Sequence, residues 1–137
     1  MEKLYSIAVK RYCENKVLYI KQDYNERDFK KLISSFERLS YDVKARVISD
    51  LYRLGSTAEA FTDVNTVFSP GEMKKLSLVL GLQRDLSIFL LDGPTNHLDV
   101  VSTRLLEKLL NRVGSTVLVV SHDPYFIVGC TSRKIHL

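Results

Sequence analysis

The sequence predicts an α/β protein whose core is a parallel sheet. The short apolar run at 88–91 has the composition of a strand that is buried on both faces, and 117–120 is another fully apolar run that predicts a strand. The stretch between them, 98–112, carries apolar residues at helical spacing. Because strands that alternate with helices need right-handed crossovers, we expect these strands to lie parallel in one sheet.

Composition indicates one ordinary globular domain or part of one. The chain has 137 residues, of which 45% are hydrophobic and 26% are charged. Its formal charge of +4 is spread along the chain and favours anionic partners only weakly. Cys13 and Cys130 lack the spacing of metal ligands or of a disulfide framework, so we expect reduced thiols. No apolar run approaches the roughly 18 residues of a membrane span, and we expect a cytoplasmic chain without a transmembrane segment.

Two stretches rich in β-forming residues open the chain. Residues 4–12 and 16–22 are separated by Cys-Glu-Asn, in which Asn15 favours a turn. This pattern predicts a β-hairpin whose second strand ends at Gln22.

Two amphipathic helices are predicted next. Apolar residues recur at helical spacing first over 29–36 and then over 43–54. Gly55 is placed to end the second helix at its C′ position. The 56–67 stretch has few periodic apolar positions, so we expect a loop there with at most one helical turn.

A third helix is predicted to begin within Phe-Ser-Pro-Gly-Glu at 68–72 and to continue to Arg84. Ser69 suits the N-cap and Pro70 the first helical position. Glu72 is placed to complete a capping box with Ser69.

Polar residues follow each apolar strand of the core. Asp92 ends the first, at the carboxyl edge where open α/β sheets bind ligands, and a carboxylate there suits hydrated Mg²⁺ and phosphates. Pro94 prevents further sheet pairing. After Gly114 and the second strand comes Ser-His-Asp-Pro at 121–124. A short apolar turn at 125–128 and a last strand at 133–137 are predicted to complete the chain.

Residues 90–99, Leu-Leu-Asp-Gly-Pro-Thr-Asn-His-Leu-Asp, resemble the Walker B and D-loop segment of ATP-binding cassette (ABC) ATPases. The ending Asn-His-Leu-Asp is the form common in the ABC-F subfamily, whose members are soluble tandem ATPases. In that family a glutamate that positions and deprotonates the attacking water follows the Walker B aspartate. Here the position is Gly93, which has no side chain to accept a proton.

Further motifs match the family in their order along the chain. The 68–72 segment resembles the ABC signature, with Pro70 in place of its first glycine, and the resemblance implies that Ser69, Gly71 and Glu72 form a helix N-terminus suited to a γ-phosphate. The remaining matches are Gln22 to the Q-loop, Asp99 to the D-loop and His122 to the switch histidine of the H-loop. Each residue also has an ordinary explanation, as a solvated glutamine, a first-turn aspartate or a structural histidine.

The resemblance implies a partial P-loop-type ABC nucleotide-binding domain. A hairpin over 1–22 would end in the Q-loop, a helical subdomain over 23–84 would carry the signature, and 85–137 would hold the Walker B, D-loop and H-loop core. The aromatic A-loop and the Walker A loop have no counterpart, since no glycine-rich loop in the sequence ends in Gly-Lys-Ser/Thr.

The implied cofactors are ATP and Mg²⁺, with a partner supplying Walker A. Asp92 and Gln22 would bind the metal, Gln22 and His122 would serve catalysis, and Asp99 would reach a second nucleotide-binding domain in cis or in trans. We expect the chain alone not to turn over ATP. Two alternatives stay open: a non-catalytic interaction module, and part of an ABC-F translation or antibiotic-resistance factor that acts at the ribosome.

Overall fold

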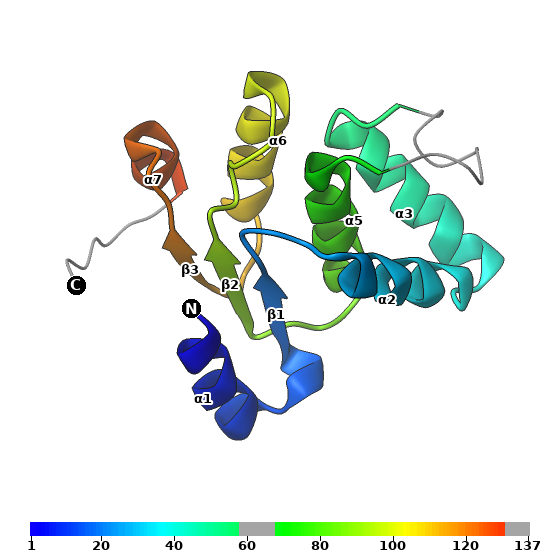
Figure 1. Ribbon diagram of the computed structural model, residues 1–137, viewed down its shortest axis with the longest axis horizontal. Coiled ribbons are helices and arrows are strands. Elements are labelled where there is room, and N and C mark those ends of the chain that lie inside the picture. The colour runs from blue at the N-terminus through cyan, green and yellow to red at the C-terminus, as the bar shows by residue number, and fades with distance from the viewer. Residues whose placement is uncertain (58–67, 131–137) are drawn as a thin grey trace.

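The computed structural model describes residues 1–57 and 68–130, which form helices around a parallel sheet (Figure 1). Strands β1 (Val17–Ile20), β2 (Ile88–Asp92) and β3 (Thr116–Val120) lie in the order β1-β2-β3, and both pairings are parallel. The α/β class and the parallel core predicted from the sequence are therefore confirmed.

Strand β2 is the centre of the sheet and is buried along Ile88–Leu91. Its register pairs Leu91 with Ile20 of β1 and Asp92 with Val120 of β3. The three strands consequently end at the same edge of the sheet, and the residues that follow them lie next to one another.

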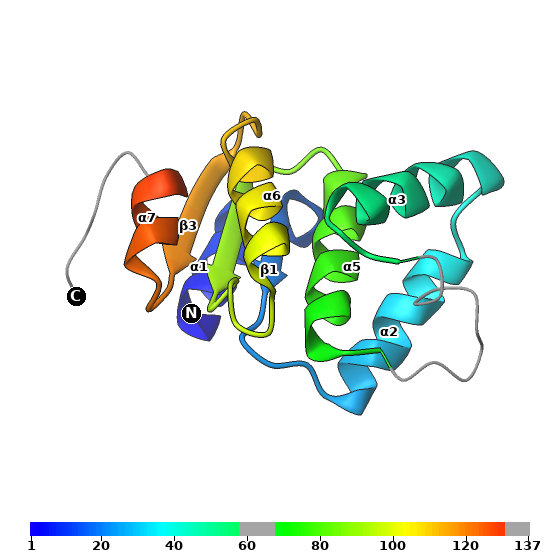
Figure 2. The ribbon, with the colours of Figure 1, turned by 90° about the horizontal axis from the view of Figure 1, so that it is seen from above.

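Helices cover the two faces of the sheet (Figures 1 and 2). On one face, Phe89 and Leu91 of β2 join the larger core with apolar residues of α5 (Pro70–Leu82), α6 (Val100–Leu110) and α7 (Pro124–Cys130). On the other, Ile88 and Leu90 pack in a smaller core beneath α1 (Glu2–Tyr12). Alternation along β2 thus divides its side chains between two cores.

Helices α2 (Glu26–Glu37) and α3 (Tyr41–Arg53) pack on the side of α5 away from the sheet (Figure 2). Asn25 and Asp28 form a reciprocal capping box at the start of α2. Gly55 follows the α3 C-cap with a φ of 80°, a conformation that glycine adopts without steric cost. Both predicted helices are confirmed, and so is the role of Gly55.

The start of α5 bears out part of the predicted capping. Ser69 is the N-cap, its hydroxyl oxygen accepts a hydrogen bond from the Glu72 N–H at 3.2 Å, and Pro70 is the first helical residue. The prediction that Glu72 completes a capping box is wrong. Its carboxylate instead accepts hydrogen bonds from Ser56 Oγ at 2.6 Å and Lys75 Nζ at 2.9 Å.

The predicted N-terminal hairpin is wrong. Residues 2–12 form α1, Asn15 lies in the 3₁₀ helix η1 (Glu14–Lys16), and β1 pairs in parallel with β2. The buried or half-buried residues of α1 and its N-cap follow the helical spacing i, i+4, i+7 and i+8: Met1, Tyr5, Ala8 and Val9. This burial against the sheet outweighs the β-propensity of the stretch.

The strand predicted at 117–120 is confirmed as β3, but it is more exposed than β2. Thr116, Leu118 and Val120 are exposed, the last two at 39% and 45%. They share a face with Ile88 and Leu90 of β2, but among the three strands the smaller core beneath α1 takes residues from β1 and β2 and none from β3.

Two sequence predictions lie outside the described residues. The 56–67 loop falls there almost entirely, and the 133–137 strand falls there completely. Among the helices that are described, none combines the length and the apolar character needed to cross a membrane. Both cysteines are free thiols.

Candidate functional site

The carboxyl edge of the sheet gathers three of the residues singled out in the sequence. Gln22 follows β1, Asp92 ends β2 and His122 follows β3. Gln22 and His122 are exposed and Asp92 is half-buried. The Gly93 N–H donates to the Val120 carbonyl oxygen at 2.8 Å and joins the ends of β2 and β3. The edge therefore presents an amide, a carboxylate and an imidazole to solvent.

Asp92 is linked to the neighbouring strand through Tyr19, a residue that the sequence analysis did not single out. The Tyr19 hydroxyl donates to Asp92 Oδ2 at 3.4 Å, and the Tyr5 ring stacks on Tyr19 at 5.4 Å between centroids. Burial, followed by the negative charge of Asp92, raises the pKa of Tyr19 to about 12. Tyr19 thus stays a neutral donor beside the carboxylate at physiological pH.

Gly93 has a backbone conformation that disfavours any side chain. Its φ is +52°, and a Cβ atom placed there would lie 2.8 Å from Asn96 Nδ2 and 3.3 Å from Gln22 Cγ. The turn after β2 therefore packs against the residue that follows β1. A glutamate at this position would have to displace Asn96 as well as adopt a strained backbone.

The 93–98 turn lies directly against the first two turns of α5. A side chain on Gly71 would collide with the His97 carbonyl oxygen, so glycine permits this close approach. Lys74 is 3% exposed, and its Nζ donates to the carbonyl oxygens of Gly93 at 2.6 Å and Asn96 at 3.1 Å. Burial lowers the pKa of Lys74, whereas the charges of Asp23 and Asp92 act in the opposite direction. Sequence periodicity alone placed Lys74 simply within a helix.

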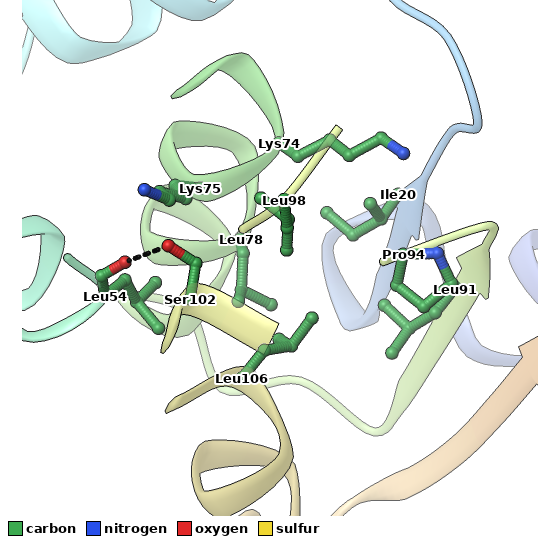
Figure 3. Close-up of a pocket in the computed structure, with 10 residues that line it drawn as sticks. All are labelled: Ile20, Leu54, Lys74, Lys75, Leu78, Leu91, Pro94, Leu98, Ser102 and Leu106. Carbon is green, nitrogen blue, oxygen red and sulfur yellow. Dashed lines mark hydrogen bonds between the residues drawn. The ribbon is translucent and has the colours of Figure 1, made fainter. Parts of the chain in front are cut away.

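A small, mostly apolar pocket is lined by residues of α5, of the 93–98 turn and of the neighbouring strands and helices (Figure 3). Ser102 is one of the lining residues, and its Oγ lies 3.1 Å from the Leu54 carbonyl oxygen. Its lining contains Ile20, Leu54, Lys74, Lys75, Leu78, Leu91, Pro94, Leu98, Ser102 and Leu106. With so few polar groups, the pocket contributes to packing and offers little for binding a phosphate.

The exposed start of α5 is the candidate signature. Ser69 and Pro70 are exposed, whereas Gly71 is buried against the turn. Both oxygens of the half-buried Glu72 carboxylate already have donors within the chain. Ser69 and the first helical turn are therefore the parts of this motif that remain accessible to an anion.

Asp99 is the N-cap of α6. Its Oδ1 accepts the Ser102 N–H at 2.8 Å, and its Oδ2 lies 2.9 Å from Ser102 Oγ. These hydrogen bonds from the backbone and hydroxyl of Ser102 lower the pKa of the Asp99 carboxyl group. Asp99 therefore has a structural role, as the N-cap of α6, that needs no partner domain.

The loop that carries His122 is held by its neighbour Asp123. Asp123 Oδ1 accepts the N–H groups of Tyr125 at 3.0 Å and Phe126 at 3.1 Å, at the start of α7. The buried Phe126 anchors that helix in the larger core. Sequence reasoning missed Asp123, although an aspartate directly before proline and an apolar turn is a typical N-cap signal.

The chemistry of the donor set fits a magnesium–nucleotide complex better than a free metal ion. Within residues 1–57 and 68–130, no group of three or more His, Cys, Asp or Glu side chains is arranged to hold a metal. Mg²⁺ commonly uses one or two protein carboxylates together with phosphate oxygens and water. Asp92 matches the protein's share of such a site.

Comparison with curated proteins gives several relatives, although no protein-family model matches the chain. The chain is 35% identical over 100 residues to the Ribosome protection protein VmlR of Bacillus subtilis, covering 73% of this chain and 18% of the relative. It is 33% identical over 128 residues to Elongation factor 3 of Pneumocystis carinii, covering 90% and 12%. With ABC transporter F family member 2 of Arabidopsis thaliana it shares 38% over 72 residues, covering 53% and 11%. The chain spans less than a fifth of the length of each of these relatives.

Among solved structures, CbiO1 of Clostridium perfringens, part of the ABC transporter complex CbiONQ, has the same fold. The TM-score is 0.57 at 19% identity, and the match covers 88% of this chain and 53% of that one. The shared fold and the similarity to these curated relatives identify the chain as a segment of an ATP-binding cassette domain. Its sequence is similar to those of ABC-F proteins.

Proposed function

We propose that this chain forms part of a composite ATP site whose Walker A loop is supplied by another segment, in cis or in trans. The observation that carries the proposal is the convergence of Gln22, Asp92 and His122 at one edge of a parallel sheet. That edge is open to solvent at Gln22 and His122. A phosphate chain lying along it would meet all three side chains.

Each residue has a distinct part in this proposal. Asp92 and Gln22 hold Mg²⁺, which neutralises phosphate charge when it is bound with ATP. Tyr19 orients the Asp92 carboxylate through its hydroxyl group. The His122 ring N–H donates to a γ-phosphate oxygen.

A second nucleotide-binding domain is the proposed partner. Ser69 and the first turn of α5 are exposed, so they offer a γ-phosphate contact to a nucleotide held mainly by that partner. Glu72 stabilises this helix start through the hydrogen bonds that its carboxylate accepts from Ser56 and Lys75. Asp99 lies at the accessible start of α6 and faces the same partner domain.

The site is proposed to bind nucleotide rather than to hydrolyse it. A general base contributes on the order of 10²–10⁴-fold to rate, and Gly93 has no group to act as one. A Walker A loop supplied by another segment would provide phosphate positioning, but it would not replace this base. Nucleotide-dependent association with a second domain is the activity left to such a site.

A role at the ribosome is a second proposal. It concerns the longer protein of which this chain would be a segment, here called the parent protein. It is favoured by the similarity to a protein named for ribosome protection and to another named as an elongation factor. A cytoplasmic location is part of this proposal. Ribosome sedimentation of the intact parent with ATP present tests it, and exclusive recovery in a membrane complex would refute it.

Calorimetry tests the nucleotide site. The chain alone should bind MgATP weakly, whereas a fusion to an amino-terminal half-domain with a Walker A loop should bind tightly and in a Mg²⁺-dependent manner. Asp92→Asn in the fusion should weaken binding at least about tenfold, since it removes a charge-assisted metal contact. Neither protein should release phosphate above a buffer blank. A fusion that binds no better than the chain alone, yet still captures a second cassette domain, would replace this proposal with the interaction module.

A further inference from the structure

Lys74 is a buried cation of helix α5. It lies in the second turn of α5, is 3% exposed, and directs its ammonium group away from the helix into the turn after β2 (Figure 3). Two backbone carbonyl groups of that turn, those of Gly93 and Asn96, accept its hydrogen bonds. A buried ammonium is costly unless such partners satisfy it, so the contact is specific.

The neighbouring lysine shows that this contact does not follow from helix composition alone. Lys75 is also buried, at 6% exposed, but its Nζ binds Glu72 on its own helix at 2.9 Å. In Figure 3 the two ammonium groups point in different directions from adjacent helical positions. Only the ammonium of Lys74 reaches the turn.

The turn that Lys74 contacts has two backbone positions of positive φ. Gly93 has a φ of 52° and His97 a φ of 67°. The second is unfavourable for a residue with a side chain and persists only where the surroundings enforce it. Three contacts with α5 can enforce it: the two hydrogen bonds of Lys74 and the close approach of Gly71 to the His97 carbonyl group.

We propose that Lys74 is a positioning residue that holds the 93–98 turn in this conformation against α5. Asp92 precedes the turn and Asp99 follows it, so the same contact fixes both carboxylates relative to the candidate signature. The effect of Lys74 on the turn is independent of nucleotide. Its consequence for a composite ATP site rests on the function proposed above.

Hydrogen exchange on the 137-residue chain tests this inference without any ligand. Lys74→Met keeps an unbranched, buried side chain but removes both hydrogen bonds. Because bonds from charged donors are worth more than neutral ones, amide exchange within 93–98 should become at least about tenfold faster. Peptides covering 88–91 of the central strand should keep their protection. Lys108→Met, at an exposed position of α6, should change neither region.

A structural role limited to filling space would give a different result. Unchanged exchange over 93–98 in Lys74→Met, with 88–91 still protected, would overturn the proposal.

If the Lys74→Met variant does not fold, a second measurement on the unmodified chain still tests the proposal. Nuclear magnetic resonance should detect a slowly exchanging Lys74 ammonium group with couplings across its hydrogen bonds to the carbonyl carbons of Gly93 and Asn96. Absence of those couplings would also overturn it. MgATP titrations test the proposed nucleotide site and not the contact of Lys74 with the turn. A failure of nucleotide binding would therefore not change the conclusion from hydrogen exchange.

Discussion

The Tyr19 hydroxyl donates to Asp92 Oδ2 at 3.4 Å and connects two adjacent strands at the edge where the candidate site lies. Because the pKa of Tyr19 is raised to about 12, its neutral form is favoured in the folded state. This stabilisation is complete below about pH 10 and is lost as pH rises through about 12.

We therefore expect the free energy of unfolding to fall between about pH 10 and 12, and to fall less steeply in Tyr19→Phe. Urea unfolding at a series of pH values measures this difference. Tyr41→Phe is the matched control, because that side chain is 86% exposed. Equal slopes for Tyr19→Phe and the unmodified chain would contradict the expectation.

Gly93→Glu should destabilise the chain rather than simply restore a catalytic group. The positive φ costs about 1–2 kcal/mol for a residue with a Cβ, and contact with Asn96 adds to it. The urea midpoint should drop, whereas Gly114→Glu should change it little, since a Cβ at Gly114 meets nothing within 4 Å. Equal midpoints for the two variants would show that the turn adapts freely. A repaired ATPase would then need only the glutamate and the Walker A half.

Asp99→Ala should cost about 0.5–2 kcal/mol through loss of the α6 N-cap, and Asp99→Asn should cost less because the amide oxygen still accepts the Ser102 N–H. The pKa of the Asp99 carboxyl group is lowered from 3.8, so its ionic contribution is present above that pH and is lost as pH falls below it. Chemical denaturation at neutral and acidic pH measures both effects. Asp42→Ala, at an exposed first-turn position of α3, serves as control.

Gly71→Ala should lower the melting temperature more than Gly129→Ala. Both added methyl groups would collide with a neighbour, but the first meets the backbone carbonyl of His97 and the second meets the flexible carboxylate of Glu107. Overpacking against a fixed backbone costs typically 1–3 kcal/mol, whereas a side-chain end can move aside. Calorimetric melting of the two variants distinguishes them, and equal losses would argue against a rigid contact between α5 and the turn.

Periodic burial made most of the core predictable from the sequence. The apolar run of β2 and the helical spacing of α2 and α3 reflect faces that pack on one another, and α5 carried the N-cap signals of Ser69 and Pro70. The prediction of a strand in the α1 stretch was wrong, because it gave more weight to the β-forming residues than to the helical spacing of Tyr5, Ala8 and Val9. That spacing was readable in the sequence.

The candidate site residues were singled out by their resemblance to motifs of ABC ATPases together with their places near strand ends. Parallel register brings the strand ends near Gln22, Asp92 and His122 to one edge of the sheet. Lys74 was not singled out, because its partners are backbone carbonyl groups 19 and 22 residues away, and no side-chain pattern reports them.

Strand β3 carries a consequence for the behaviour of the polypeptide in concentrated solution. Among the described residues no strand pairs with its outer edge, and Leu118 and Val120 are exposed beside that edge. A bare edge with apolar side chains is a template on which further strands can add, and native proteins suppress such growth with charged residues. The chain kept by itself should aggregate as its concentration rises, and Leu118→Lys should keep it dispersed.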